Sequence, residues 1–119
     1  MDALENLDVW KRSCRLSVSL YRELRACCDL GFKDQITRSA LSVPSNIAEG
    51  YERDSARELQ RFLRIAKGSC GELRTQLYIG IESGFVERET GLKLVLEAAE
   101  ISRMIHGLIR RYDTAELTP

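Results

Sequence analysis

Apolar residues recur three and four positions apart along most of this chain, the spacing that places side chains on one face of an α-helix. Four such stretches follow one another, and none alternates with the period of two expected for a strand. The connections between them are short, which favours antiparallel packing of successive helices. The pattern predicts an all-α fold, an antiparallel up-down-up-down four-helix bundle formed by residues 1–119 as a single domain.

The predicted helices span residues 7–28, 33–51, 56–83 and 90–112. The first is expected to end near Gly31, because glycine readily takes the left-handed conformation of a helix C-terminus. The third begins with a capping box, Ser55 and Glu58, and ends before Gly84. The segment 113–119 has no apolar periodicity and is predicted to be a frayed tail.

Pro44 lies inside the second apolar pattern, where proline removes a backbone hydrogen bond and costs about 3 kcal/mol. Two interpretations are open: two short helices that meet at Val43, or one kinked helix. The apolar line continues in phase across Pro44, which favours a single second helix kinked at that residue.

More apolar residues are present than one bundle core needs. The third and fourth predicted helices carry them away from the main apolar face, and the first helix has a broadened face. These residues are Ile65, Tyr78, Ile79, Leu92, Leu96, Ala99, Val9, Leu16, Leu20 and Cys27. Surplus apolar surface on three helices predicts a homo-oligomer, with a subunit number that periodicity leaves open.

Charge and composition narrow the functional classes. The chain has 18 acidic and 18 basic residues, a balance that argues against a strongly basic nucleic-acid binder and gives no reason to expect a membrane partner. No stretch is long and apolar enough for a spanning helix, and the acidic N-terminus does not resemble a signal peptide, so a cytoplasmic location is expected. In that reducing compartment the cysteines are predicted to be small core residues rather than redox groups: Cys14, Cys27, Cys28 and Cys70.

A polar cluster can be drawn on the second and third helices. Its members are Arg38, Ser42, Ser45, Asn46, Glu49, Ser69 and Glu72. One hypothesis is a ligand site lined by an arginine and two carboxylates. The favoured hypothesis is a structural hydrogen-bonded network, in which Gly68 and Gly71 let helix backbones approach closely.

A basic stripe is the second candidate site, and it lies beside the apolar face of the third helix. It consists of Arg53, Arg57, Arg61, Arg64 and Lys67. Three interpretations stay open: contact with nucleic-acid phosphates, pairing with acids such as Glu97 or Glu100 of a neighbouring subunit, or a solvated face.

No arrangement of residues indicates catalysis. His106 is the only histidine, so it forms neither a catalytic pair nor a metal site with a second one, and it is expected at the surface or an interface. Motifs of serine hydrolases, phosphate loops and zinc proteases are missing from the sequence. We therefore expect no enzyme activity, no catalytic residue, no metal and no cofactor.

Several short motifs together resemble one known family. They are Leu7-x-Val-Trp10, Tyr21, Gln35-x-x-Arg38, Ser42, Ser45-Asn-Ile-Ala-Glu-Gly50, Arg53, Phe62-Leu-x-Ile-Ala-x-Gly-Ser69, Glu72 and Leu108-Ile109. From residue 7 to 112 the chain looks like the four-helix bundle proteins encoded in intervening sequences of bacterial 23S rRNA genes. It is similar in architecture to the accessory proteins of diversity-generating retroelements, which engage a reverse transcriptase and nucleic acid.

The resemblance implies a ring-shaped homopentamer and no established activity. We therefore expect a non-enzymatic oligomeric scaffold or adaptor that associates with itself and with a protein or RNA partner. The alternative is an accessory protein that binds RNA or DNA through the basic stripe. A shared fold is by itself a weak argument for either function.

Overall fold

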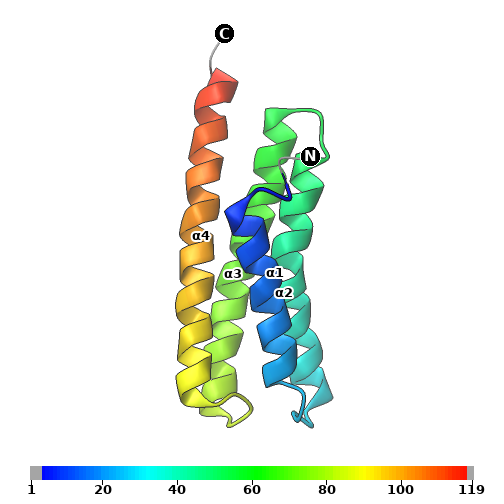
Figure 1. Cartoon of the computed structure of the whole chain (residues 1–119), viewed down its shortest axis with the longest axis vertical. Helices are drawn as coiled ribbons and strands as arrows, with labels where there is room; N and C mark the ends of the chain where they lie inside the picture. Colours follow the sequence, from blue (N-terminus) through cyan, green and yellow to red (C-terminus); the bar gives the residue numbers. More distant parts are fainter. Residues whose placement is uncertain (1–3, 118–119) are drawn as a thin grey trace.

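The computed structural model describes the backbone of residues 4–117 and the side chains of residues 4–113. Within that range it contains four helices and no strand: α1 (Asp8–Glu23), α2 (Leu30–Tyr51), α3 (Ala56–Glu82) and α4 (Arg88–Leu117). Successive helices run in opposite directions (Figure 1). Each helix packs against its neighbours in sequence, and α1 also packs against α4, in a bundle of 52 × 23 × 22 Å. The predicted all-α class is confirmed.

One face of each helix supplies the core, as the apolar spacing predicts. The most deeply buried large side chains come from all four helices and the turn after α1: Leu20, Leu24, Ile36, Ile47, Leu63, Leu73, Leu77, Ile101 and Ile105. Fully burying such a side chain stabilises the fold by about 1.5–3 kcal/mol. The packing of these side chains sets which helix faces remain available at the surface.

The boundary between α1 and α2 differs from the prediction. α1 ends at Glu23 rather than at Cys28, and α2 begins at Leu30 rather than at Lys33. Asp29 is the reason, because its side chain accepts a hydrogen bond from the Phe32 backbone N–H at 2.9 Å and caps α2. Gly31, predicted to end the first helix, lies instead in the first turn of α2. The helix was predicted to be too long because Leu24, in the turn after α1, is completely buried and so continues the apolar periodicity.

α2 continues through Pro44 as one helix, so the interpretation with two short helices is wrong. Proline has no backbone N–H, and the carbonyl four residues before it, that of Ala40, loses its usual helical partner. The buried hydroxyl of Ser17 on α1 donates to that carbonyl at 3.0 Å. A side chain of the neighbouring helix thus satisfies the group that Pro44 leaves open. A kink at Pro44 remains a prediction.

α3 begins and ends close to the predicted residues. The Ser55 hydroxyl accepts from the Glu58 backbone N–H at 3.1 Å, which is the first half of the capping box. The second half is not formed, because the Glu58 carboxylate bonds to Arg61 instead, at 3.2 Å. Gly84 follows the C-terminus with a φ of +83°, the left-handed conformation that favours glycine at this position.

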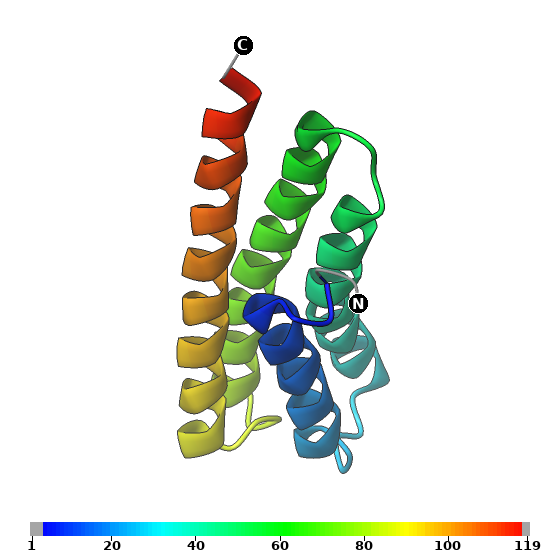
Figure 2. The same ribbon diagram turned by 45° about the horizontal axis from the view of Figure 1, so that its top comes forward.

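α4 is longer than predicted at both ends. Glu87 caps it, with its carboxylate accepting from the backbone N–H groups of Glu89 and Thr90 at 2.9 Å each. At the other end the helix continues to Leu117, through most of the predicted frayed tail, and residues 118 and 119 lie outside the described range. Gln60 and Arg64 of α3 both bind Asp113 and hold this part of α4. Figure 2 shows its end projecting beyond α2 and α3.

Exposed apolar side chains are present on α3 and α4, as predicted. Most of the residues predicted to add apolar surface on α1 are buried instead. Ile65, Tyr78, Ile79, Leu92 and Leu96 are exposed. Val9, Leu16 and Leu20 instead belong to the core, so counting them as surplus was wrong. Other residues of the α1–α2 side, Val18, Tyr21, Leu30 and Leu41, are exposed in their place.

Candidate functional site

Part of the predicted polar cluster forms a hydrogen-bonded network between α2 and α3. The hydroxyls of Ser42 and Ser69 lie 2.8 Å apart. Asn46 donates to both the carbonyl and the hydroxyl of Ser42, at 2.8 and 2.9 Å. Ser69 is buried, and its hydroxyl also contacts the Ile65 carbonyl at 3.1 Å. These contacts fix the register of α2 against α3, as expected of a structural network.

The charged members of the cluster are not part of the hydrogen bonds that join the serines and Asn46. Arg38 pairs with Asp34 on its own helix at 3.0 Å, and Glu49 pairs with Arg53 at 2.8 Å. Glu72 and Ser45 are exposed. The two hypotheses for this cluster, a ligand site and a structural network, both remain predictions.

The first half of the basic stripe is held by acids of the same chain. Arg53 pairs with Glu49, and Arg61 pairs with Glu58 at 3.2 Å. Both guanidinium groups also lie over the Phe62 ring, 4.8 and 4.4 Å from its centroid. Hydrogen bonds from Arg61 lower the pKa of the Glu58 carboxyl below its ordinary value. Sequence reasoning had considered acids of a neighbouring subunit but not these.

The second half of the stripe turns toward α4. Arg64 lies 3.7 Å from the Asp113 carboxylate, and Lys67 Nζ lies 3.3 Å from His106 Nδ1. Arg57 is exposed, and no ion pair is recorded for it among the side chains of residues 4–113. Two of the five residues therefore lie around Phe62 and two line the junction of α3 and α4, and a common role of the five remains a prediction.

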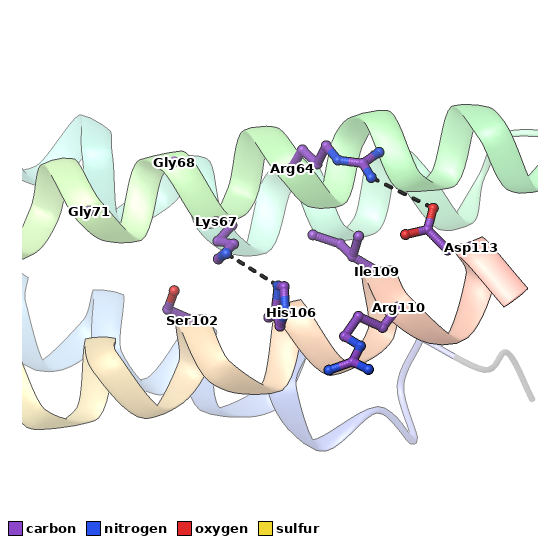
Figure 3. Close-up of a pocket in the computed structure, with 9 residues that line it drawn as sticks. All are labelled: Arg64, Lys67, Gly68, Gly71, Ser102, His106, Ile109, Arg110 and Asp113. Carbon is purple, nitrogen blue, oxygen red and sulfur yellow. Dashed lines mark hydrogen bonds and ion pairs between the residues drawn. The ribbon is translucent and has the colours of Figure 1, made fainter.

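A groove of about 560 Å³ lies at this junction (Figure 3). Arg64 and Lys67 border it on α3, and His106, Arg110 and Asp113 border it on α4. An adjoining hollow of about 420 Å³ shares Lys67, His106 and Arg110. The carboxylate of Asp113 is the one acidic group among the nine residues that line the larger groove. This feature unites residues that the sequence analysis had treated separately.

Glycines form part of the groove wall, and they do not serve the predicted purpose. A Cβ atom added at Gly68 or Gly71 would meet no neighbouring atom within 4 Å, so these glycines do not let helix backbones of this chain approach. The close approaches occur at other glycines. A Cβ at Gly80 would lie 2.7 Å from Phe32 Cζ, and one at Gly91 would lie 2.6 Å from Ile81 Cγ1.

The cysteines are only partly the core residues that were predicted. Cys70 is fully buried, and burial raises the pKa of its thiol to about 12. Cys14 and Cys27 are half-buried and Cys28 is exposed, so the prediction is wrong for Cys28. All four are unpaired.

Among the described residues, no group of three or more histidine, cysteine, aspartate or glutamate side chains could hold a metal ion. No described helix has a stretch long and apolar enough to cross a bilayer.

Several residues that shape the groove and the helix contacts were missed by sequence reasoning. Gln60 is buried and donates to the Ile109 carbonyl at 3.1 Å and to Asp113. Ser102 and Gly107 of α4 lie near Lys67 only because α3 and α4 pack side by side in this register. In the sequence, the only sign of these residues was a glutamine or a glycine within a helical apolar pattern. The residue that each one contacts depends on how α3 and α4 are aligned.

The comparisons with known proteins agree with this architecture. A crystal structure of a protein with unknown function from the S23 ribosomal protein family of Bacteroides thetaiotaomicron is similar, with a TM-score of 0.76 and 23% identity. The match covers 85% of this chain and 97% of that one, and at this identity it supports the fold alone. The comparison with curated proteins gave no match. The family model described as 23S rRNA-intervening sequence protein matches residues 5–107, and the chain belongs to this family.

Proposed function

We propose that the chain is a non-enzymatic helical scaffold that acts by associating with further copies of itself. The observation that carries this proposal is a pair of exposed apolar patches, one on the α3–α4 pair and one on the α1–α2 pair. The first, patch A, consists of Tyr78, Leu92 and Leu96 on α3 and α4. The second, patch B, consists of Val18, Tyr21, Leu30 and Leu41 on α1 and α2. Exposed apolar surface of this kind marks interaction sites.

Helix register brings the members of patch A together. Lys67 on α3 meets His106 on α4, so positions 78 and 95, three turns farther along each antiparallel helix, lie at the same level. Leu92 and Leu96 flank that level. Tyr78, Leu92 and Leu96 are 51%, 37% and 69% exposed, so each is available to a partner.

Contacts between α1 and α2 assemble patch B in the same way. Ser17 bonds to the Ala40 carbonyl, which places their sequence neighbours Val18 and Leu41 near one another. Tyr21 and Leu30 line one hollow. The α1–α2 and α3–α4 connections lie at the same end of the bundle (Figure 1), so patches A and B are at similar heights.

Two different patches on two different helix pairs favour head-to-tail association, in which patch A of one copy meets patch B of the next. Such contacts form a closed ring when the rotation between copies closes. The homopentamer implied by the family resemblance is one such ring. The four unpaired cysteines suit a reducing cytoplasm, where we place this assembly.

The alternative function, nucleic-acid binding by the whole basic stripe, has less support than the scaffold proposal. Arg53 and Arg61 are paired with Glu49 and Glu58 and lie over Phe62. Contact with a phosphate would replace interactions that these side chains already make. The scaffold proposal does not require them.

Patch variants test the head-to-tail arrangement. Leu96→Ser should disrupt patch A and Leu41→Ser patch B, and each variant should elute as a smaller species in size exclusion with light scattering. A mixture of the two should form heterodimers, because each supplies the patch that the other lacks. Ile65→Ser is the matched control, since Ile65 is 41% exposed and outside both patches. Single variants that remain as large as the unmodified protein would refute the arrangement.

A further inference from the structure

We infer that the groove between α3 and α4 binds the phosphodiester backbone of a nucleic-acid strand. This goes beyond the scaffold proposal. It places the nucleic-acid contact in the groove rather than at Arg53, Arg57 and Arg61. The inference rests on three features of the groove: its helical glycines, its charge and its hydrogen-bond donors.

The glycines of this groove have no packing role within the chain. Gly68 and Gly71 on α3 and Gly107 on α4 all leave open space where a Cβ would be. A glycine in a helix interior costs up to about 1 kcal/mol relative to alanine. Gly50, Gly80 and Gly91, in contrast, are each crowded by side chains of the same chain. The open glycines keep the groove wall low, so a ligand can approach the helix backbone.

The charge of the groove suits an anion. Arg64, Lys67 and Arg110 line the larger part, with Asp113 as the single carboxylate. Asp113 lies at one end of the groove, where Gln60 and Arg64 bind it. The adjoining hollow is lined by Lys67, Arg103 and Arg110, and Arg103 pairs with Glu100 at 2.8 Å. The groove is therefore cationic although the whole chain has a formal net charge of zero.

The donors lie on both walls. Lys67 Nζ lies 3.3 Å from His106 Nδ1 across the junction, and a lysine ammonium only donates hydrogen bonds. The imidazole of His106 therefore lies beside the hydroxyl of Ser102 and the ammonium of Lys67 (Figure 3). Phosphate oxygens accept from all of these groups.

The length of the groove favours a strand over a single phosphate. From Gly71 to Arg64 the α3 wall extends for seven residues, about 10 Å at 1.5 Å per residue. Arg64, Lys67 and Arg110 lie toward one half of this length, and Arg103 of the adjoining hollow lies about one turn farther along the junction. An extended backbone can place successive phosphates along such a groove, whereas one free phosphate contacts only part of it.

Fluorescence anisotropy with a short, labelled single-stranded RNA tests the inference on the full chain. The unmodified protein should bind at low salt, with an affinity that falls as salt rises. Lys67→Gln/Arg110→Gln should bind at least about tenfold more weakly and with a shallower salt dependence. Gly68→Leu should also weaken binding, because it narrows the groove without changing any charge. Circular dichroism checks that both variants stay folded.

The matched control is Arg57→Gln/Arg88→Gln, which removes two charges from exposed positions outside the groove. It should change the affinity by less than about twofold. Absence of binding at low salt would overturn the inference, and so would an equal loss in the control or no effect of Gly68→Leu. Inorganic phosphate serves as the competitor. If it displaces RNA at equal phosphate concentration, the groove binds a single phosphate and the assignment to a strand is wrong.

Discussion

The hydroxyl of Ser17 on α1 donates a hydrogen bond to the backbone carbonyl of Ala40 on α2, at 3.0 Å. This is the carbonyl that would accept from residue 44 if that residue were not a proline. The contact explains how an interior proline is accommodated in a continuous helix, and it joins two helices of the bundle.

Ser17→Ala should therefore destabilise the fold by about 1–2 kcal/mol, because a buried carbonyl loses its partner. The loss should be much smaller in a Pro44→Ala background, where the new backbone N–H at position 44 can bond to the Ala40 carbonyl. Urea denaturation of the four proteins in this cycle measures the coupling. Equal losses in both backgrounds would show that Ser17 acts independently of Pro44.

Arg12 and Glu97 form a paired contact between α1 and α4, with two hydrogen bonds of 2.8 and 2.6 Å. The hydrogen bonds from Arg12 lower the pKa of the Glu97 carboxyl. A carboxyl with a lowered folded-state pKa stabilises the fold above its unfolded-state pKa, about 4.3, and this contribution is lost as pH falls through the folded-state pKa.

Glu97→Gln should consequently reduce stability by up to about 1 kcal/mol at neutral pH, since both side chains are about one-third exposed. The difference from the unmodified protein should shrink as pH falls below about 4. Urea denaturation across this pH range provides the measurement. Glu89→Gln is the control, because Glu89 is 78% exposed and lies 3.8 Å from Lys93. A Glu97→Gln difference that persists unchanged at low pH would contradict the proposed role of the carboxylate.

Substitution of glycines should have opposite effects at two kinds of position. Gly71→Ala should stabilise α3 by about 0.5–1 kcal/mol, because the added methyl group meets open space. Gly91→Ala should cost about 1–3 kcal/mol, since its Cβ would lie 2.6 Å from Ile81 Cγ1. Thermal unfolding of both variants distinguishes them. Destabilisation by Gly71→Ala would show that its surroundings are filled.

The thiols should differ sharply in reactivity. Cys28 is exposed, whereas Cys70 is buried with a pKa of about 12. Because the thiolate is the reactive form, a thiol reagent at pH 8 should label Cys28 rapidly and Cys70 only on unfolding. Mass spectrometry of time-resolved labelling locates the modified residues. Early labelling of Cys70 in the native protein would contradict its burial.

Periodicity predicted the four helices because burial of one face of each helix is a local property of sequence. It failed at the end of α1, where Leu24 is buried from a turn and a competing cap at Asp29 starts the next helix. Similarly, Asp113 gave no apolar indication that α4 continues, because its partners Gln60 and Arg64 lie on α3.

The candidate sites were less predictable than the fold, for the same reason. Ser42 and Ser69 were correctly grouped, since their helices are adjacent in sequence. Arg61 pairs with Glu58 on its own helix, whereas Lys67 contacts His106 of α4, a partner that spacing along α3 does not give. The groove between α3 and α4 requires the register of these helices, which spacing along one helix does not contain.

Self-association through patches A and B is the central claim, and the mass of the unmodified protein in solution tests it most directly. Size exclusion with multi-angle light scattering at micromolar concentration should give a multiple of the 13.5 kDa chain mass, with five copies for the ring that the family resemblance implies. A single species of 13.5 kDa under these conditions would contradict the claim.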